Sequence, residues 1–166
     1  MNKLIAAVMA AIMAIFTCVS YPQMLSEAVS SQLIEQSGAN VGESGQCGVN
    51  AYYELSGGKL TITGTGNMTS WDMASDTPWY KSRSSISSVV IGDGITNIGP
   101  GAFAECTNLR SISIPKTVTS ISRGAFLRCS GLSSLDLSEN VTSLGREALR
   151  GCSSLNSLTI RNPKCS

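Results

Sequence analysis

The sequence has 166 residues, with 12 basic and 11 acidic side chains and no histidine, and this length favours a single domain. The net charge of +1 offers no electrostatic attraction for nucleic acid or for an anionic membrane. Histidine is the commonest general base and metal ligand, and no serine or cysteine stands in a recognisable nucleophile motif, so we expect no enzymatic activity, no cofactor and no metal.

Residues 1–26 are predicted to be a signal peptide. Lys3 supplies a positive charge before a nearly unbroken apolar run from Leu4 to Val19, and small residues that suit signal peptidase follow. The run is shorter than the ~20 apolar residues of a membrane-spanning helix. We therefore expect a secreted or cell-surface protein with no membrane span after cleavage. An uncleaved anchor and a lipid anchor at Cys18 are the alternatives.

Two further segments follow the signal peptide. Residues 27–46 are rich in Ser, Gly, Gln and Glu and are predicted to form a flexible linker. Residues 47–85 are predicted to form a small β-rich cap. Within this cap, two strand-like runs at 52–55 and 59–63 flank Ser-Gly-Gly, which is typical of a β-hairpin.

The aromatic residues of the predicted cap have two interpretations. We expect Trp71, Trp79 and Met68 to cover the first of the repeats described below, because the terminal unit of a repeat stack exposes one side of its core. Aromatic side chains beside such an edge are usually buried. The alternative is a carbohydrate site built on Tyr52, Trp71, Trp79 and Tyr80.

The C-terminal part of the chain repeats with a period of 23 residues. Three complete units and a partial fourth cover 86–108, 109–131, 132–154 and 155–166. Positions are numbered from the first apolar residue of each unit, which is Ile86, Leu109, Leu132 or Leu155. Apolar residues recur at positions 4, 6, 10, 13, 17 and 18, and cysteine recurs at position 21. A single unit cannot bury these side chains, so the units are expected to stack.

Each unit has three predicted parts. Positions 4 and 6 alternate with mostly polar positions 3 and 5, which predicts a half-buried strand, and stacking pairs these strands in parallel at a spacing of about 4.8 Å. Positions 10–13 are predicted to form a second extended segment. Ala-Phe-x-x-Cys at positions 17–21 has the spacing of a helical turn. The predicted fold is therefore an α/β repeat solenoid, with a parallel sheet on one face and a β-rich cap before it.

The repeats also resemble a known family. The third unit carries L-x-x-L-x-L-x-x-N from Leu132 to Asn140, and the second carries Ile-Pro-x-x-Val-x-x-Ile and Ala-Phe-x-x-Cys from Ile114 to Cys129. With these motifs, residues 86–160 resemble BspA-like leucine-rich repeats. The resemblance implies a short leucine-rich-repeat stack in a secreted or surface-exposed protein of a bacterium or a parasitic protist. Family members with an assigned role are generally linked to adhesion or to binding of host proteins.

The cysteines at position 21 are expected to be buried free thiols, which behave as small apolar side chains. They are Cys106, Cys129 and Cys152. Adjacent units bring their α-carbons within disulfide range, so a bridge between neighbours is the alternative. Metal ligation is disfavoured, because a spacing of one repeat without histidine matches no zinc-binding pattern.

The exposed face of the predicted sheet is the candidate ligand-binding surface. It consists of the residues at positions 3 and 5: Ser88, Val90, Ser111, Ser113, Ser134, Asp136, Ser157 and Thr159. This face is polar and flat, which suits a protein or glycan ligand, for example on a host surface or in its matrix. We therefore expect a binding module for adhesion or recognition. The alternative is a structural spacer, or a remnant of a longer array, with no ligand of its own.

The predicted face is small. Four short strands give about 300 Å² in plan, whereas a standard interface takes about 800 Å² from each partner. The chain is therefore expected to bind weakly or in multiple copies. The C-terminal edge of the stack has no predicted cap, so self-association through that edge is a further expectation.

Overall fold

The computed structural model describes residues 42–165, so the predicted signal peptide and most of the predicted linker lie outside the described residues. The described part contains ten strands and two short 3-10 helices. Their bounds are β1 (Glu43–Gln46), β2 (Gly48–Ser56), β3 (Lys59–Met68), η1 (Ala74–Asp76), η2 (Tyr80–Ser85), β4 (Ser88–Ile91), β5 (Ile95–Ile98), β6 (Ser111–Ser113), β7 (Ser120–Ile121), β8 (Ser134–Leu137), β9 (Ser143–Leu144) and β10 (Ser157–Ile160). Within this range, no helix is long and apolar enough to cross a lipid bilayer.

The predicted hairpin is present. β2 and β3 pair in antiparallel register, from Gly48 opposite Met68 to Ser56 opposite Lys59. Gly57 and Gly58 in the turn have positive φ values of 56° and 77°, a backbone conformation that glycine adopts without steric cost. The Gly-Gly pair is therefore the reason why the chain reverses here.

Strand β1 corrects part of the predicted linker. Glu43–Gln46 pair antiparallel with residues 52–55 of β2, and the hydroxyl of Ser82 donates a hydrogen bond to the carboxylate of Glu43. Strand pairing is made by backbone groups, so a polar segment can add to a free sheet edge without any apolar pattern of its own. For this reason composition alone predicted a linker where the structure has a strand.

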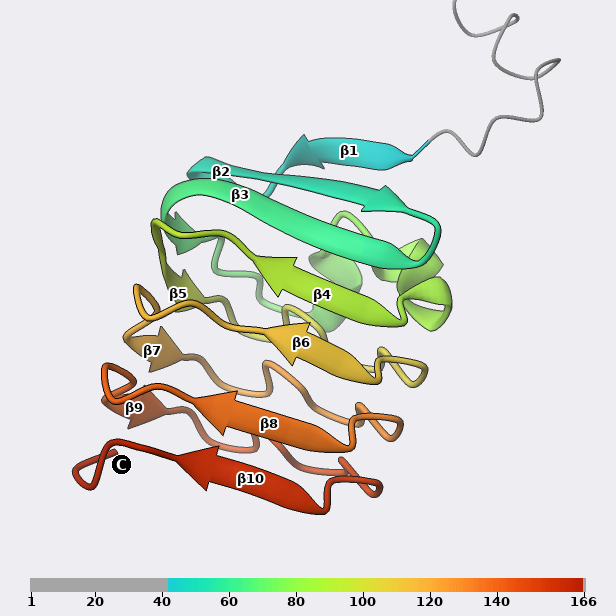
Figure 1. The fold of residues 1–166 in the computed structure, drawn as a ribbon. Coiled ribbons are helices and arrows are strands. Elements are labelled where there is room, and N and C mark those ends of the chain that lie inside the picture. Colours follow the sequence, from blue (N-terminus) through green and yellow to red (C-terminus); the bar gives the residue numbers. More distant parts are fainter. Residues whose placement is uncertain (1–41, 166) are drawn as a thin grey trace, which may run out of the picture. The chain divides into compact units, whose positions relative to one another are not determined.

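The repeats form two columns of parallel strands (Figure 1). The front column contains β4, β6, β8 and β10, and the back column contains β5, β7 and β9. Strand pairs are offset by one repeat, so that Ser88 aligns with Ser111 in front and Ser120 aligns with Ser143 behind. Strand β3 starts both columns, because its first half pairs with β4 and its second half with β5. The parallel register confirms the predicted stacking of the repeat strands.

The core lies between the two columns and continues into the N-terminal segment. Phe103 and Phe126, both at position 18, stack with their ring centroids 5.6 Å apart. Trp79 stacks on Phe103 at 6.0 Å and donates a hydrogen bond from Nε1 to the carbonyl oxygen of Ala102 at 2.8 Å. Trp71 packs edge-on against Trp79, and both tryptophans are buried. Their burial removes both indoles from the carbohydrate platform that the sequence left as an alternative.

The helical turn expected at positions 17–21 is not formed, and residues 42–165 contain no α-helix. Positions 16 and 20 are left-handed, with φ values of 63° at Gly101 and 62° at Glu105. The other two repeats have positive φ at the same positions: Gly124, Arg128, Glu147 and Gly151. A right-handed helix cannot pass through such residues. Alternate N–H groups bond to the next repeat instead, as from Phe103 to the carbonyl oxygen of Ala125 at 2.8 Å. The helical part of the predicted fold class is therefore wrong.

The cysteines at position 21 are free thiols that face the core. Cys106 and Cys129 are buried and Cys152 is half-buried. The thiol of Cys129 donates a hydrogen bond to the carbonyl oxygen of Phe103 at 3.0 Å, and the thiol of Cys152 donates to that of Phe126 at 3.1 Å. Burial raises the pKa of Cys106 to about 12, and burial followed by the neighbouring cysteines raises the pKa of Cys129. These thiols therefore stay protonated at neutral pH.

The cysteines should differ in reactivity. In the folded chain at pH 8, iodoacetamide should label the half-buried Cys165 faster than Cys106 and Cys129. The thiolate is the attacking species, and burial keeps the thiols of Cys106 and Cys129 protonated and away from the reagent. Mass spectrometry of the labelled peptides measures this, with a sample in urea as the fully labelled control. Equal labelling of Cys106 and Cys165 in the folded chain would contradict the burial.

The stability of the chain should also depend on pH. The thiol of Cys106 titrates near 9.0 in the unfolded chain and at a higher pH in the folded chain, so the free energy of unfolding should fall as the pH rises above 9.

Trp79 should be a major contributor to stability. Trp79→Ala removes a buried indole that contacts Trp71 and Phe103, so we expect a loss of about 3–5 kcal/mol in the free energy of unfolding. Urea denaturation measures this change. Tyr52, whose side chain is exposed, provides the matched control, since Tyr52→Ala should cost less than about 1 kcal/mol. Similar losses for both variants would show that the indole is not part of the core.

Candidate functional site

All eight candidate face residues lie on the front strands, at positions 3 and 5 of each repeat. Six of them are exposed: Ser111, Ser113, Ser134, Asp136, Ser157 and Thr159. Ser88 and Val90 on β4 are half-buried. The register aligns these residues in columns between β4 and β6 and between β8 and β10. The front column is therefore a polar surface that repeats from strand to strand.

The front column is interrupted between β6 and β8. Strand β6 pairs with β4 and strand β8 pairs with β10, but β6 and β8 belong to separate sheets. At the start of the strands, Arg110 N–H bonds to the carbonyl oxygen of Ser87 at 2.9 Å, and Asn156 N–H bonds to that of Ser133 at 3.1 Å. The N–H of Ser133 makes no corresponding bond within the described part of the chain. The back column has no such gap, because β7 bonds to both β5 and β9.

Pro115 stands beside this gap, at position 7 of the second repeat. In the first and fourth repeats the residue at position 7 donates its N–H to the preceding strand, as from Gly92 to Ile62 at 2.8 Å and from Arg161 to Leu137 at 3.1 Å. Proline has no N–H, so Pro115 cannot make this bond to the preceding strand β4. It also restricts the backbone of the residue before it, Ile114. Strand β6 accordingly ends at Ser113.

Two isoleucines become accessible where the front column is interrupted. Ile112 and Ile114 occupy positions 4 and 6 and are only half-buried. The residues at these positions on β4 and β8 are buried: Val89, Ile91, Leu135 and Leu137. Solvent therefore reaches apolar side chains here that neighbouring repeats enclose.

A groove with a volume of about 570 Å³ lies at this point, within the range of about 300–1,000 Å³ for small-ligand pockets. The two isoleucines, Ile112 and Ile114, supply its apolar part. The remaining lining side chains are polar: Ser113, Lys116, Asp136, Ser138, Glu139 and Arg161. They come from three consecutive repeats. Ser113 and Asp136 are members of the predicted face, so the groove extends that face toward the ends of the strands.

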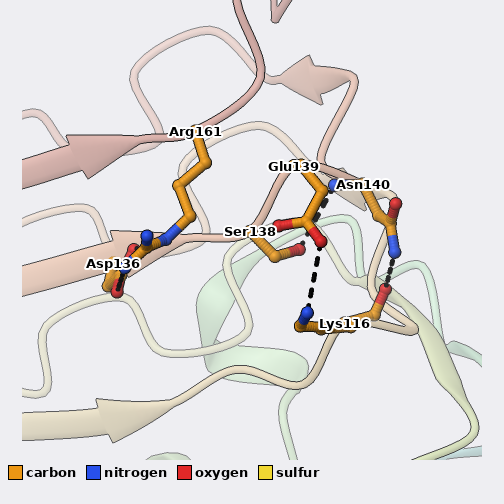
Figure 2. Close-up of polar contacts among 6 residues, drawn as sticks. All are labelled: Lys116, Asp136, Ser138, Glu139, Asn140 and Arg161. Carbon is orange, nitrogen blue, oxygen red and sulfur yellow. Dashed lines mark hydrogen bonds and ion pairs between the residues drawn. The ribbon is translucent and has the colours of Figure 1, made fainter.

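Two ion pairs border the groove, one on either side of Ser138 (Figure 2). Arg161 donates from Nε to Oδ1 of Asp136 at 3.0 Å and from Nη2 to Oδ2 at 2.6 Å. Lys116 Nζ lies 3.2 Å from Oε1 of Glu139. Both pairs cross from one repeat to the next. The groove therefore carries two cations and two anions, held in place by the register of the stack.

The charges of the groove are stabilised by their partners. The hydrogen bond from Arg161 lowers the pKa of Asp136 below its usual value. A hydrogen bond from its own backbone N–H, followed by the one from Lys116, lowers the pKa of Glu139. Each carboxylate therefore stays ionised at neutral pH, and its ion pair is lost only as the pH falls through that lowered pKa. The groove therefore presents an electrically balanced rim.

Asn140 shows how a leucine-rich-repeat position is used in this chain. Its Nδ2 donates a hydrogen bond to the carbonyl oxygen of Lys116 in the preceding repeat at 2.8 Å (Figure 2). Thr117, one repeat earlier, accepts a hydrogen bond through Oγ1 from the N–H of Gly94 at 3.2 Å. Position 9 thus links neighbouring repeats through a side chain in both cases. The Asn140 link also fixes the turn that carries Glu139.

Part of this site could not be seen in the sequence. The predicted face included Ser113 and Asp136 but not Lys116, Glu139 or Arg161, because it was limited to positions 3 and 5 of the predicted strands, and these three residues occupy positions 7 and 8. The available signal in the sequence is the Ile-Pro pair at 114–115, because proline restricts the residue before it and favours the end of a strand. No group of three or more Cys, Asp or Glu side chains in residues 42–165 is placed to hold a metal ion.

The chain is similar to leucine-rich-repeat sequences and structures. The family profile described as "BspA type Leucine rich repeat region (6 copies)" matches residues 77–165. A leucine-rich repeat protein from Eubacterium ventriosum has a crystal structure with a TM-score of 0.55 and 26% identity, over 70% of this chain and 40% of that one. The chain thus spans less than half the length of that protein. No curated protein sequence matches the chain.

Two further solved structures are similar in part. A leucine rich cell surface protein from Faecalibacterium prausnitzii has a TM-score of 0.43 and 27% identity, over 47% of this chain and 20% of that one. A leucine-rich repeat protein from Bacteroides ovatus has a TM-score of 0.46 and 19% identity, over 67% of this chain and 40% of that one.

Proposed function

Because the chain belongs to the family of BspA-type leucine-rich repeats, we propose that it is a secreted or cell-surface binding module that recognises a protein and has no catalytic role. The predicted signal peptide at 1–26 supports export. The repeated polar face of β4, β6, β8 and β10 supports recognition, because a ligand meets similar groups at each repeat. Adhesion to a host surface or matrix is the role that the family resemblance favours.

The groove between β6 and β8 is the observation that carries this proposal. It combines half-buried Ile112 and Ile114 with the ion pairs Lys116–Glu139 and Asp136–Arg161. An apolar contact surrounded by charged side chains is typical of protein-recognition surfaces. None of the side chains that line the groove is aromatic. We therefore favour a protein partner over the glycan that the sequence analysis also allowed.

We also propose that residues 47–85 cap the stack. Strand β3 pairs with β4 and β5, and so supplies the bonds that a preceding repeat would supply. Trp79 continues the stack of Phe103 and Phe126. Both contacts support a role in closing the N-terminal side of a solenoid core.

Self-association through β10 is a separate proposal. Leu158 and Ile160 on β10 are 43% and 44% exposed, whereas Leu135 and Leu137 at the same positions of β8 are 3% and 0% exposed. The outer edge of β10 pairs with no other described strand. An apolar strand edge of this kind favours pairing with a second copy.

Sedimentation velocity of the chain over a range of concentrations tests the self-association. We expect a dimer that is lost in the double variant Leu158→Glu with Ile160→Lys, because the charges would be buried in the contact. The control is Val49→Glu, which changes another exposed apolar side chain and should leave the dimer unchanged. A monomer at every concentration for the unaltered chain would reject this proposal.

The strand face can be tested with paired arginines. Purified matrix and serum proteins are immobilised, and binding of the unaltered chain is compared with that of Ser111→Arg with Ser134→Arg. Both serines are exposed, so stability should change little, while binding should fall at least tenfold. Thr119→Arg with Thr142→Arg, at exposed positions beside the back column, is the matched control. Binding lost only in the control pair would place the ligand on another surface, and no binding to any protein would favour the structural spacer.

A further inference from the structure

We infer that the groove between β6 and β8 binds an extended segment of the protein partner, in which one aliphatic side chain stands between two oppositely charged residues. This inference rests on the proposed function, because it names the part of the partner that the site would recognise. Three properties of the groove lead to it: unpaired backbone groups, an apolar wall and a balanced charged rim.

The first property is a backbone donor and a backbone acceptor that have no partner. Between the third and fourth repeats, the N–H of Arg161 bonds to the carbonyl oxygen of Leu137 at 3.1 Å. The corresponding groups one repeat earlier are the N–H of Ser138 and the carbonyl oxygen of Ile114. These two groups make no hydrogen bond to each other, or to any other residue within 42–165. These two groups are therefore open to hydrogen bonds from the backbone of a peptide that lies over the gap.

The second property is the apolar wall formed by Ile112 and Ile114. Both side chains are half-buried, and the groove of about 570 Å³ reaches them. Covering such surface contributes about 25 cal/mol per Å² of apolar area removed from water. A ligand that brings one leucine, isoleucine or valine side chain would restore the enclosure that Val89 and Leu135 have in the neighbouring repeats.

The third property is the charge pattern of the rim. Asp136 with Arg161 lies at one end and Lys116 with Glu139 at the other (Figure 2). Each end offers one cation and one anion, so the net charge of the rim is zero. A polyanion or polycation would meet as much repulsion as attraction. A segment with one basic and one acidic residue on either side of its aliphatic residue complements both ends.

Blocked synthetic peptides provide the probe. Acetyl-Gly-Lys-Leu-Glu-Gly-amide is titrated into the 15N-labelled chain, and amide chemical shifts are followed by NMR. We expect saturable shifts at Ser138 and Glu139 with a dissociation constant of about 1 mM. The peptide with asparagine in place of leucine should bind at least tenfold more weakly, and so should the peptide with serine in place of both charged residues.

Two variants of the chain locate the binding. Ser113→Trp should abolish the shifts, because Ser113 lines the groove and the indole would fill it. Thr142→Trp places the same side chain at an exposed position beside the back column, outside both the groove and the front face, and should leave the dissociation constant unchanged. Loss of binding in both variants, or in neither, would overturn the assignment.

The remaining outcomes are also decisive. No saturable shift up to about 20 mM, well above the expected constant, would overturn the inference, as would equal binding of the leucine and asparagine peptides. Stronger binding of a chitin oligosaccharide would replace the peptide with a glycan. Ser111 and Ser134 do not line the groove, so the paired-arginine experiment is independent of this one. If the peptides fail while the arginine pair still abolishes binding to a matrix protein, the proposed function stands and only the groove assignment falls.

Discussion

The hydrogen bonds from each repeat to the next are the interaction on which the fold depends. No single unit of this chain encloses its apolar side chains, and each gains its cover from the unit stacked on it. The bonds occur at three places around the repeat: the front strands, the back strands and the turns at positions 16–20. Because all three share one offset, a side chain such as Phe103 meets its own equivalent, Phe126, in the neighbouring unit. The core is therefore a set of columns of like residues.

The site follows from a local failure of the same interaction. Where the front bonds are missing, between β6 and β8, the backbone and two isoleucines are left accessible. The back column and the turns hold the units together there, as from Phe126 to the carbonyl oxygen of Ala148 at 2.9 Å. The interruption thus opens a groove without disrupting the stack. The proposed binding surface lies where the front strand pairing is interrupted and involves no added loop.

The sequence predicted the features of the fold that depend on the repeat period and on the pattern of apolar and polar residues. Recurrence of Val89, Ile112 and Leu135 at one position was enough to place the strands, their parallel register and the buried face. It failed at positions 17–21, because the left-handed φ values of Glu105 and Arg128 are unusual for residues with side chains and have no signal in an apolar pattern. It also missed β1 and the ion pairs. Backbone pairing at a free edge, and side-chain contacts such as Lys116–Glu139 and Asp136–Arg161 between adjacent units, depend on the three-dimensional register.

The interrupted front column also gives the stack a direction of bending. Between the second and third repeats the backbone–backbone hydrogen bonds of the described residues lie at the back strands and at the turns, as from Thr142 to Thr119 and from Gly124 to Arg146. An applied force that separates the ends of the molecule would therefore open the front first, with the back strands acting as a hinge. The repeats before and after this point would rotate as two blocks. The width of the groove between those blocks would therefore depend on mechanical load.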